Sequence, residues 1–456
     1  MYLNPHKLRD ILKPYPVQII FFGGIYMITA ITGGSFGDEG KGKMTDLLAA
    51  KADIVVRFQG GANAGHTIIN DYGKFVLHLL PSGVFYRHTE NIIASGAAFD
   101  ADEFFAELKM LSENGVPEPC VMVSSRAQLL LPVHKLWDKN EERRLGENRF
   151  GSTHSGIAPF YSEKYAKHNF QISDLYYDNV SEKASRFCQD KNKFFKAFYG
   201  IENALSAELL SEYLNDLKIK LKPYLIDCPY YMNKAIKTGK NILLEGQLGA
   251  LRDVDNGIYP YVTSSSPLAG FASVSAAIPP FEIKSVVSVI KAYSTCVGAG
   301  PFVGELFGDE GDALRRRGGD SGEYGSKTGR PRRMAWFDCV SASYGCMIQG
   351  ATETAMTMLD VLSFLDVIPV CVGYNINGEI TDKFPETYKL NSAKPVYEYL
   401  KGWKTDISGI SSYDELPEET RKYVEFIENR IGVPITMISN GPRREQIIYR
   451  NCKIAS

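Results

Sequence analysis

The residues best suited to chemistry lie in one short stretch, Gly33 to Asp46, with the sequence GGSFGDEGKGKMTD. Backbone N–H groups of a glycine loop at a helix N-terminus bind anions, and Lys41 or Lys43 can add a positive charge. The stretch fits most of the phosphate-loop pattern, but Met44 stands where that pattern has the serine or threonine that binds Mg²⁺. Asp38 could supply the missing metal ligand or accept a proton from a substrate. The sequence therefore predicts a nucleotide-phosphate site with an unusual acidic residue.

A second polar, glycine-rich stretch spans Gln59 to Thr67, with the sequence QGGANAGHT. It follows a second apolar run, so we expect it to open at the same edge of a parallel sheet as the first loop. His66 is one of only seven histidines, and an imidazole can transfer a proton near neutral pH. Asn63 and Thr67 add an amide and a hydroxyl group. Two such loops on neighbouring strands predict one shared functional site.

The apolar runs around both loops predict the elements that hold them. Ile28 to Thr32 is expected to be a buried strand, Gly42 to Lys51 a helix, and Asp53 to Gln59 a second strand. This order is a βαβ unit, which implies a parallel sheet with right-handed crossovers. Residues 180–240 are expected to be helical, and further strands are expected at Asn241–Leu244, Ser285–Ala292, Val367–Gly373 and Pro434–Ile438. The predicted fold class is α/β, with a large, mainly parallel central sheet flanked by helices and interrupted by helical insertions.

Length and composition limit the class of protein. The 456 residues are 44% hydrophobic, and 51 basic and 53 acidic residues give a formal net charge of −2. This balance gives no sign of a nucleic-acid partner or a membrane surface. The eight cysteines contain no CxxC pair, and we interpret them as reduced thiols of a cytoplasmic protein.

The first 26 residues are interpreted as an extension that precedes the domain. KLRDILK and the apolar run from Val17 to Gly34 imitate a signal peptide, but that run continues directly into the glycine loop. MITAITGG, from Met27, forms a complete first strand by itself. We therefore expect Met27 to be the natural start and residues 27–456 to form a single α/β domain. An intact mass that includes residues 1–26, measured on protein purified from its native source, would contradict this expectation.

Motifs from Met27 almost to the C-terminus resemble those of the adenylosuccinate synthetase family. In order they are GDEGKGK, NAGHT, KFVLHLLPSG, LLEG, YPYVTSS, TGRPRR, LDVL and ISNGP. The resemblance implies ligation of L-aspartate to the 6-position of IMP, driven by GTP and requiring Mg²⁺, in AMP biosynthesis. The γ-phosphoryl group would move to the purine 6-oxygen, and the aspartate amine would then displace it. The resemblance also implies a large parallel-sheet α/β domain that forms a homodimer.

Roles for the residues of the two loops follow from the resemblance. Asp38 would remove the N1 proton of IMP and bind Mg²⁺, and His66 would act as a general acid as charge leaves the γ-phosphate. The Gly65 carbonyl would also contact the metal, and Asn63 would approach the purine 6-oxygen. GTP would contact Gly37, Glu39, Gly40, Lys41, Gly42, His66 and Thr67.

Later motifs are implied to complete three pockets. IMP would contact Asp38, Asn63, Ser152, Thr153, Lys167, Gln247, Leu248, Thr263 and Arg330. Lys167 stands where the family has an arginine that reaches the partner subunit's nucleotide. L-Aspartate would contact Thr328, Arg330 and Lys327, the last of which replaces a threonine of the family. The rest of the GTP site would be Arg332, Met358, Asp360, Ser439, Gly441 and Pro442, with Asp360 accepting hydrogen bonds from guanine N1 and the 2-amino group.

The chain departs from the family pattern within these pockets. His154 and Ser155 replace a glycine and an arginine, and Met358 stands where a lysine usually lies along guanine. Leu248 occupies the position of a glutamine that steadies the purine 6-oxygen, with Gln247 one position earlier. A buried polar group left without its partner costs about 1–3 kcal/mol, so this change could weaken IMP recognition or admit another 6-oxopurine.

Three functions remain open from the sequence. The first is conventional adenylosuccinate synthesis in a drifted pocket. The second is the same ligation on GMP or dGMP, leading to a modified purine. The third is a nucleotide-binding protein that has lost ligation, against which the presence of Asp38 and His66 argues. Asp360 favours guanine over adenine as the donor base, because adenine N1 is an acceptor.

Overall fold

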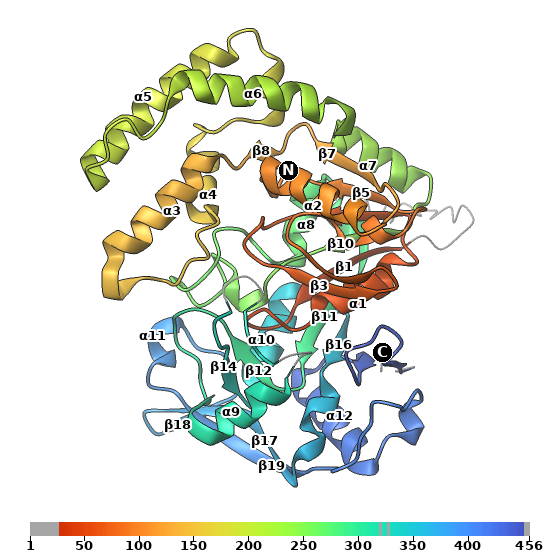
Figure 1. The fold of residues 1–456 in the computed structure, drawn as a ribbon. Coiled ribbons are helices and arrows are strands. Elements are labelled where there is room, and N and C mark those ends of the chain that lie inside the picture. Colours follow the sequence, from red (N-terminus) through yellow and green to blue (C-terminus); the bar gives the residue numbers. More distant parts are fainter. Residues whose placement is uncertain (1–26, 319–321, 326–328, 451–456) are drawn as a thin grey trace, which may run out of the picture.

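The computed structural model describes residues 27–318, 322–325 and 329–450 (Figure 1). The predicted extension, residues 1–26, and the predicted aspartate-site residues Lys327 and Thr328 therefore lie outside the described residues. The largest sheet has ten strands in the order β21-β20-β16-β11-β1-β10-β2-β5-β7-β9. Their bounds in chain order are β1 Ile28–Gly33, β2 Ile54–Arg57, β5 Glu90–Ile93, β7 Cys120–Ser124, β9 Leu225–Ile226, β10 Ile242–Glu245, β11 Ile283–Lys291, β16 Glu353–Thr357, β20 Ile435–Ser439 and β21 Ile447–Tyr449.

Neighbouring strands of this sheet are parallel except for β21, which pairs antiparallel with β20. The predicted α/β class with a mainly parallel central sheet is therefore confirmed. The expectation that β1 and β2 are neighbours is wrong, because β10 lies between them with Leu244 opposite both Ala30 and Val56. All four residues of β10 are buried, so this apolar strand fits the centre of the sheet better than its edge.

The helices of the described residues cover both faces of the sheet and extend beyond it (Figure 1). The predicted first helix is α1, and the predicted helical region 180–240 contains α5, α6 and α7. No helix in the described residues is long and apolar enough to cross a membrane. The helix bounds are α1 Lys41–Ala49, α2 Ala101–Glu113, α3 Pro132–Leu145, α4 Ile157–Ala166, α5 Val180–Tyr199, α6 Ala207–Leu221, α7 Cys228–Lys237, α8 Ala269–Ala276, α9 Gly308–Arg317, α10 Cys339–Gln349, α11 Thr387–Leu390 and α12 Glu418–Ile431.

The two faces of the central sheet use alternate residues of each strand. In β2, Val55 belongs to the same apolar cluster as Met44 of α1. Its neighbours Ile54 and Val56 belong to a different cluster, with Met232 of α7. Successive side chains of a strand point to opposite faces, so α1 covers one face and α7 the other. This packing fixes α1, and with it the glycine loop, against the sheet.

A second sheet lies at the other end of the molecule from α5 and α6 (Figure 1). Its main strand, β17 (Val367–Ile376), pairs parallel with β15 (Phe337–Asp338) and antiparallel with β18 (Glu379–Thr381) and β19 (Lys394–Lys401). The strand predicted at Val367–Gly373 therefore exists, but it is outside the central sheet. An apolar run predicts a strand and does not specify its neighbours.

Candidate functional site

The glycine loop between β1 and α1 turns through left-handed backbone conformations. Gly37, Asp38 and Gly40 have φ angles of 99°, 60° and 81°. Glycine adopts such angles without strain, whereas an aspartate there is held by its surroundings. Glu39 points inward and accepts hydrogen bonds from the backbone N–H groups of Ser35 (3.1 Å) and Gly37 (2.7 Å). The loop is therefore closed by Glu39, while the carboxylate of Asp38 remains partly exposed.

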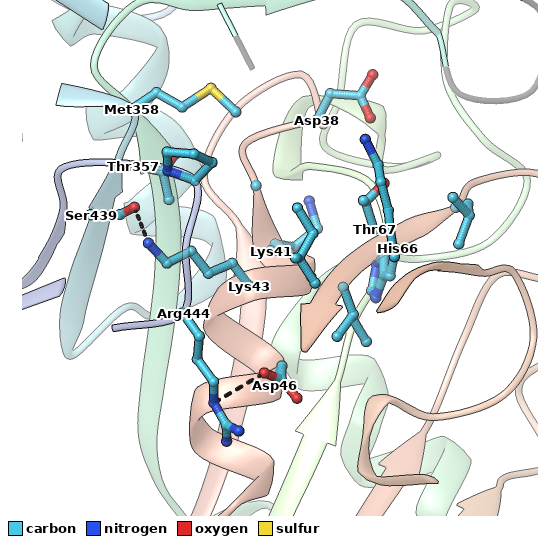
Figure 2. Close-up of a pocket in the computed structure, with 18 of the residues that line it drawn as sticks. Asp38, Lys41, Lys43, Asp46, His66, Thr67, Thr357, Met358, Ser439 and Arg444 are labelled. Carbon is cyan, nitrogen blue, oxygen red and sulfur yellow. Dashed lines mark hydrogen bonds and ion pairs between the residues drawn. The ribbon is translucent and has the colours of Figure 1, made fainter. Parts of the chain in front are cut away.

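A cavity of about 420 Å³ opens beside this loop, at the carboxyl ends of the parallel strands (Figure 2). This is the edge at which open α/β sheets bind ligands. The cavity wall also contains an ion pair that no motif predicted, with Arg444 Nε 3.3 Å from Asp46 Oδ2. The predicted site residues that line the cavity are Asp38, Gly40, Lys41, Gly42, Gly65, His66, Thr67, Leu248, Arg332, Met358, Asp360, Ser439, Gly441 and Pro442.

Other predicted residues lie outside this cavity. Ser152 donates from its hydroxyl to Asp138 Oδ2 at 2.8 Å, and Lys167 is exposed at the end of α4. Arg330 lies beside the segment that is predicted to bind the phosphate of IMP, because a Cβ added at Gly151 would be 3.6 Å from the Arg330 Nη1. The predicted residues that do not line the cavity are Gly37, Glu39, Asn63, Ser152, Thr153, Lys167, Gln247, Thr263 and Arg330.

Gln247 and Leu248 have different environments. The Gln247 amide is buried; its Nε2 lies 3.1 Å, 2.9 Å and 3.0 Å from the carbonyl oxygens of Gly61, Ala64 and His78, and its Oε1 accepts from the Gly61 N–H at 3.2 Å. These bonds use both ends of the amide to hold the second glycine-rich loop. Leu248, with a φ of 61°, lines the cavity instead.

His66 begins the hairpin strand β3 (His66–Asn70) and is oriented by two buried charges. Its Nδ1 lies 2.6 Å from Oε1 of Glu245, and Arg57 Nη1 lies 2.6 Å from the same oxygen. Because the ionised carboxylate accepts, Nδ1 carries the proton. Within the described residues Nε2 is buried and has no hydrogen-bond partner. The ring therefore offers a bare acceptor nitrogen.

The protonation states of this triad follow from burial and charge. Burial, and then the positive charge of Arg57, lowers the pKa of His66 from 6.5 to about 4. Burial raises the pKa of Glu245, but the charge of Arg57 and the hydrogen bond from His66 outweigh burial and lower this pKa to about 2. His66 is thus neutral at pH 7 in the ligand-free protein, and a bound anion favours its protonated form.

No sequence motif predicted Arg57 or Glu245 as residues of the site. Each is the last residue of an otherwise apolar strand, in the runs IVVR and ILLE. A charged residue at the end of a buried strand was the available signal, because a buried charge requires a partner. Only the adjacent placement of β2 and β10 shows that the two residues are partners.

A second buried network orients Arg332 toward Asp38. Arg332 Nε lies 2.9 Å from Asp38 Oδ2, and its Nη1 donates to Glu323. Glu323 is fully buried and also accepts from Lys291 Nζ (2.9 Å) and the Tyr293 hydroxyl. Burial raises the pKa of Glu323, but the charges of Lys291 and then Arg332 outweigh burial and lower this pKa to about 2. The ionised, buried carboxylate of Glu323 thus holds the Nη1 of Arg332, while the Nε of Arg332 contacts Asp38. No sequence motif indicated Glu323, Lys291 or Tyr293.

The cavity wall also contains Met358 and Asp360. Met358 adopts a φ of 58°, and its Sδ lies 3.2 Å from the Tyr293 hydroxyl. Burial raises the pKa of Asp360, and its own backbone N–H and Lys43 oppose that rise. This part of the cavity wall therefore presents one acidic acceptor and a polarisable thioether.

The residues near the phosphate loop fit a magnesium ion. Mg²⁺ at phosphate sites binds through one or two carboxylates together with phosphate oxygens and waters. Asp38 supplies one carboxylate, and Gly65 lies in the same cavity wall. Among the described residues no group of three or more His, Cys, Asp or Glu side chains could hold a metal by itself. The donor set is therefore suited to a metal that arrives with a nucleotide.

Comparison with known proteins identifies the family. The adenylosuccinate synthetase family model matches residues 30–448. Adenylosuccinate synthetase of Carboxydothermus hydrogenoformans is 44% identical over 420 residues, which are 92% of this chain and 97% of that protein. The enzyme of Thermomicrobium roseum is 43% identical over 427 residues, which are 93% of this chain and 98% of that protein.

Solved structures agree with this assignment. The fully ligated adenylosuccinate synthetase of Plasmodium falciparum superposes with a TM-score of 0.85 at 35% identity, covering 93% of this chain and 99% of that chain. A cyanophage S-2L succinoaminodeoxyadenylate synthetase, at 18% identity and a TM-score of 0.58, covers 93% of this chain and 96% of that chain and shares the fold. Because the family model matches residues 30–448 and these relatives cover most of the sequence, the chain belongs to the adenylosuccinate synthetase family of C–N-bond-forming ligases.

Proposed function

We propose that this chain uses GTP to join L-aspartate to the 6-position of IMP, giving adenylosuccinate, GDP and phosphate. Family membership supports the reaction class. The structural observation that supports it best is the contact between Asp38 of the phosphate loop and Arg332, in a cavity that also contains Asp360. One cavity thus offers a base, a phosphate site and an acceptor for guanine.

The chemistry assigns separate roles to Asp38 and His66. The oxygen at purine C6 is a poor leaving group until it is phosphorylated, and loss of the N1 proton makes it a better nucleophile. Asp38 would accept that proton, with Arg332 holding its carboxylate in place. His66 would take up a proton at Nε2 beside the γ-phosphate and stabilise the charge of the transferring group. Mg²⁺, held by Asp38 and the Gly65 carbonyl, would neutralise phosphate charge.

The remaining contacts are proposals of the same kind. GTP phosphates would lie against the loop from Gly37 to Gly42, and Arg330 would bind an aspartate carboxylate with Lys327 and Thr328. The phosphate of IMP would contact Ser152, Thr153 and Thr263. Lys167, exposed on its own subunit, would reach the nucleotide of a second subunit in a homodimer. We place the reaction in the cytoplasm.

One observation favours a second candidate substrate. The Gln247 amide is hydrogen-bonded to backbone groups, and Leu248 lines the cavity. If no glutamine steadies the 6-oxygen, the pocket loses one means of selecting IMP. The second candidate is therefore the same ligation on a guanine nucleotide, GMP or dGMP.

A substrate panel tests both candidates. The protein is mixed with Mg²⁺, L-aspartate and either GTP or ATP, and IMP, GMP, dGMP or XMP is added separately. Phosphate release and the mass of the adduct are measured. Turnover with IMP and GTP supports the first proposal, and turnover with a guanine nucleotide but not IMP replaces it with the second. Nucleotide binding without any turnover contradicts both.

A further inference from the structure

The turn between β20 and β21 forms one wall of the cavity and is held by Lys43 (Figure 2). Lys43 Nζ donates to the Ser439 hydroxyl at 2.7 Å, the Gly441 carbonyl at 2.8 Å and the Gln446 carbonyl at 2.8 Å. A lysine ammonium has three N–H donors, so these contacts use its full capacity. Figure 2 shows the Lys43 side chain directed at Ser439, with Asp38 on the other side of the view.

The three oxygens bracket the whole turn. Ser439 is the last residue of β20, Gly441 lies within the turn, and Gln446 directly precedes β21. The Gln446 side chain closes the turn further by accepting from the Arg443 N–H at 2.8 Å. One charge at the centre of these oxygens therefore sets the shape of the segment that contains Ser439 and Gly441.

The position of Lys43 in the chain joins this turn to the phosphate loop. Lys43 is the third residue of α1, which begins directly after the loop. The same ammonium acts on Asp360, whose pKa burial raises and the charge of Lys43 lowers, while Asp406 raises it. Lys43 thus contacts the turn that contains Ser439 and Gly441, and its charge also acts on the carboxylate of Asp360. Both the turn and Asp360 belong to the proposed guanine site.

We infer that Lys43 is a positioning residue that sets the specificity for the donor base, and is not a direct phosphate ligand. The inference rests on the proposed use of GTP. A phosphate ligand would affect all nucleoside triphosphates equally, because they share the same phosphates. A residue that shapes the base wall affects GTP and ATP differently, because guanine and adenine differ only at the base edge.

The test uses the full chain with Lys43→Met, which keeps the length of the side chain and removes its charge and donors. We measure kcat/KM for GTP and for ATP with IMP, L-aspartate and Mg²⁺. We expect the ratio of the two kcat/KM values to fall at least about tenfold, while KM for IMP and L-aspartate stays within about twofold. An equal loss for GTP and ATP, with an unchanged ratio, overturns the inference.

Controls separate this result from misfolding and from a failure of the proposed function. Lys51→Met removes an exposed charge just beyond the same helix and should leave the ratio unchanged. If thermal melting shows that Lys43→Met does not fold, Lys43→Arg keeps the positive charge but cannot place one compact ammonium among the three oxygens. Its ratio should fall in the same direction, and no change overturns the inference. Affinities for GDP and ADP, measured by calorimetry, give the same comparison without turnover, so an inactive wild type refutes only the proposed reaction.

Discussion

Asp38 is placed by its neighbours at the cost of backbone strain. A φ of 60° in a non-glycine residue and an ion pair with Arg332 at 2.9 Å fix its carboxylate beside the phosphate loop. Arg332 is in turn held by the buried carboxylate of Glu323. The carboxylate is therefore oriented before any ligand binds, which is the arrangement that proton transfer requires.

We expect Asp38→Asn to lower kcat by about two to four orders of magnitude, because an amide cannot accept the N1 proton of IMP. GTP affinity in the absence of Mg²⁺ should change little, since the N–H groups of the loop remain. Phosphate release and calorimetric titration measure the two quantities. Retained turnover would show that another group is the base; Asp71→Asn, a change outside the cavity lining, should behave as wild type.

Asp360→Asn tests donor recognition by a single acceptor. An asparagine presents an N–H₂ group to one of the two guanine donors, so the preference for GTP over ATP should fall at least about tenfold. Competition between GTP and ATP in the ligation assay measures the preference. Asp406→Asn changes a nearby exposed charge and serves as the control. A preference that survives Asp360→Asn would place base recognition elsewhere in the cavity.

At the scale of elements, α10 fixes the glycine loop through the absence of a side chain. A Cβ added at Gly345 would overlap the carbonyl oxygen of Gly34, at the end of β1. We expect Gly345→Ala to lower the free energy of unfolding by about 1–3 kcal/mol through overpacking. It should also lower kcat, because the loop must move away from α10.

Gly270 in α8 provides the matched control, since an added Cβ there meets no atom within 4 Å. Gly270→Ala should raise the free energy of unfolding by about 0.5–1 kcal/mol, because alanine favours a helix over glycine. Urea denaturation measures both variants. A Gly345→Ala protein as stable and active as wild type would mean that α10 does not constrain the loop.

Much of this arrangement was predictable from local sequence. Apolar runs that end at glycine predicted β1 and β2, and the stretch that follows the first loop predicted α1. The glycine-rich polar stretches predicted both loops, and residues 180–240 were predicted to be helical. The order of the strands was not predictable, because nothing in ILLE indicates that β10 separates β1 from β2. Glu323 and Lys291 were missed for the same reason, since 32 residues separate partners that meet only in the folded chain.

At the scale of the whole molecule, buried histidines make stability depend on pH. His66 and His134 have native pKa values of about 4 and about 3, because burial lowers both from 6.5. The folded state then binds fewer protons than the unfolded state between these values and 6.5, so stability is lost as pH falls through that range. Burial raises the pKa of Glu107 to about 7, so the stability that Glu107 contributes is lost as pH rises and regained as pH falls. Glu107 therefore partly offsets the loss of stability caused by the two histidines.

We therefore expect the melting temperature to fall as the pH is lowered from 6.5 to 4. Each unit by which burial lowers a histidine pKa removes up to about 1.4 kcal/mol from the free energy of unfolding. His134→Asn, which can still accept from the Leu131 N–H, should lose less stability over this range. Exposed His88→Asn should match the wild-type slope. Thermal denaturation across pH measures all three proteins, and parallel curves for wild type and His134→Asn would contradict the expectation.

The proposed dimer also has a test at this scale. If Lys167 contributes to the site of a second subunit, specific activity should fall on dilution together with the dimer fraction. Sedimentation velocity and initial rates over the same concentrations measure both. Constant specific activity in a protein that has dissociated to monomers would contradict a shared site.

The position of β10 also has a consequence for synthesis of the chain. β1 and β2 have no direct pairing, so their shared partner is missing until Ile242–Glu245 has left the ribosome, about 190 residues after β2. Pairings between such distant segments form slowly, and nascent chains expose unpaired strand edges in the meantime. The first 240 residues are thus synthesised without the strand that joins the two glycine-rich loops. Arrested nascent chains in which Ile242–Glu245 is still inside the ribosome, and longer ones in which it has emerged, should differ sharply in protease resistance around the phosphate loop.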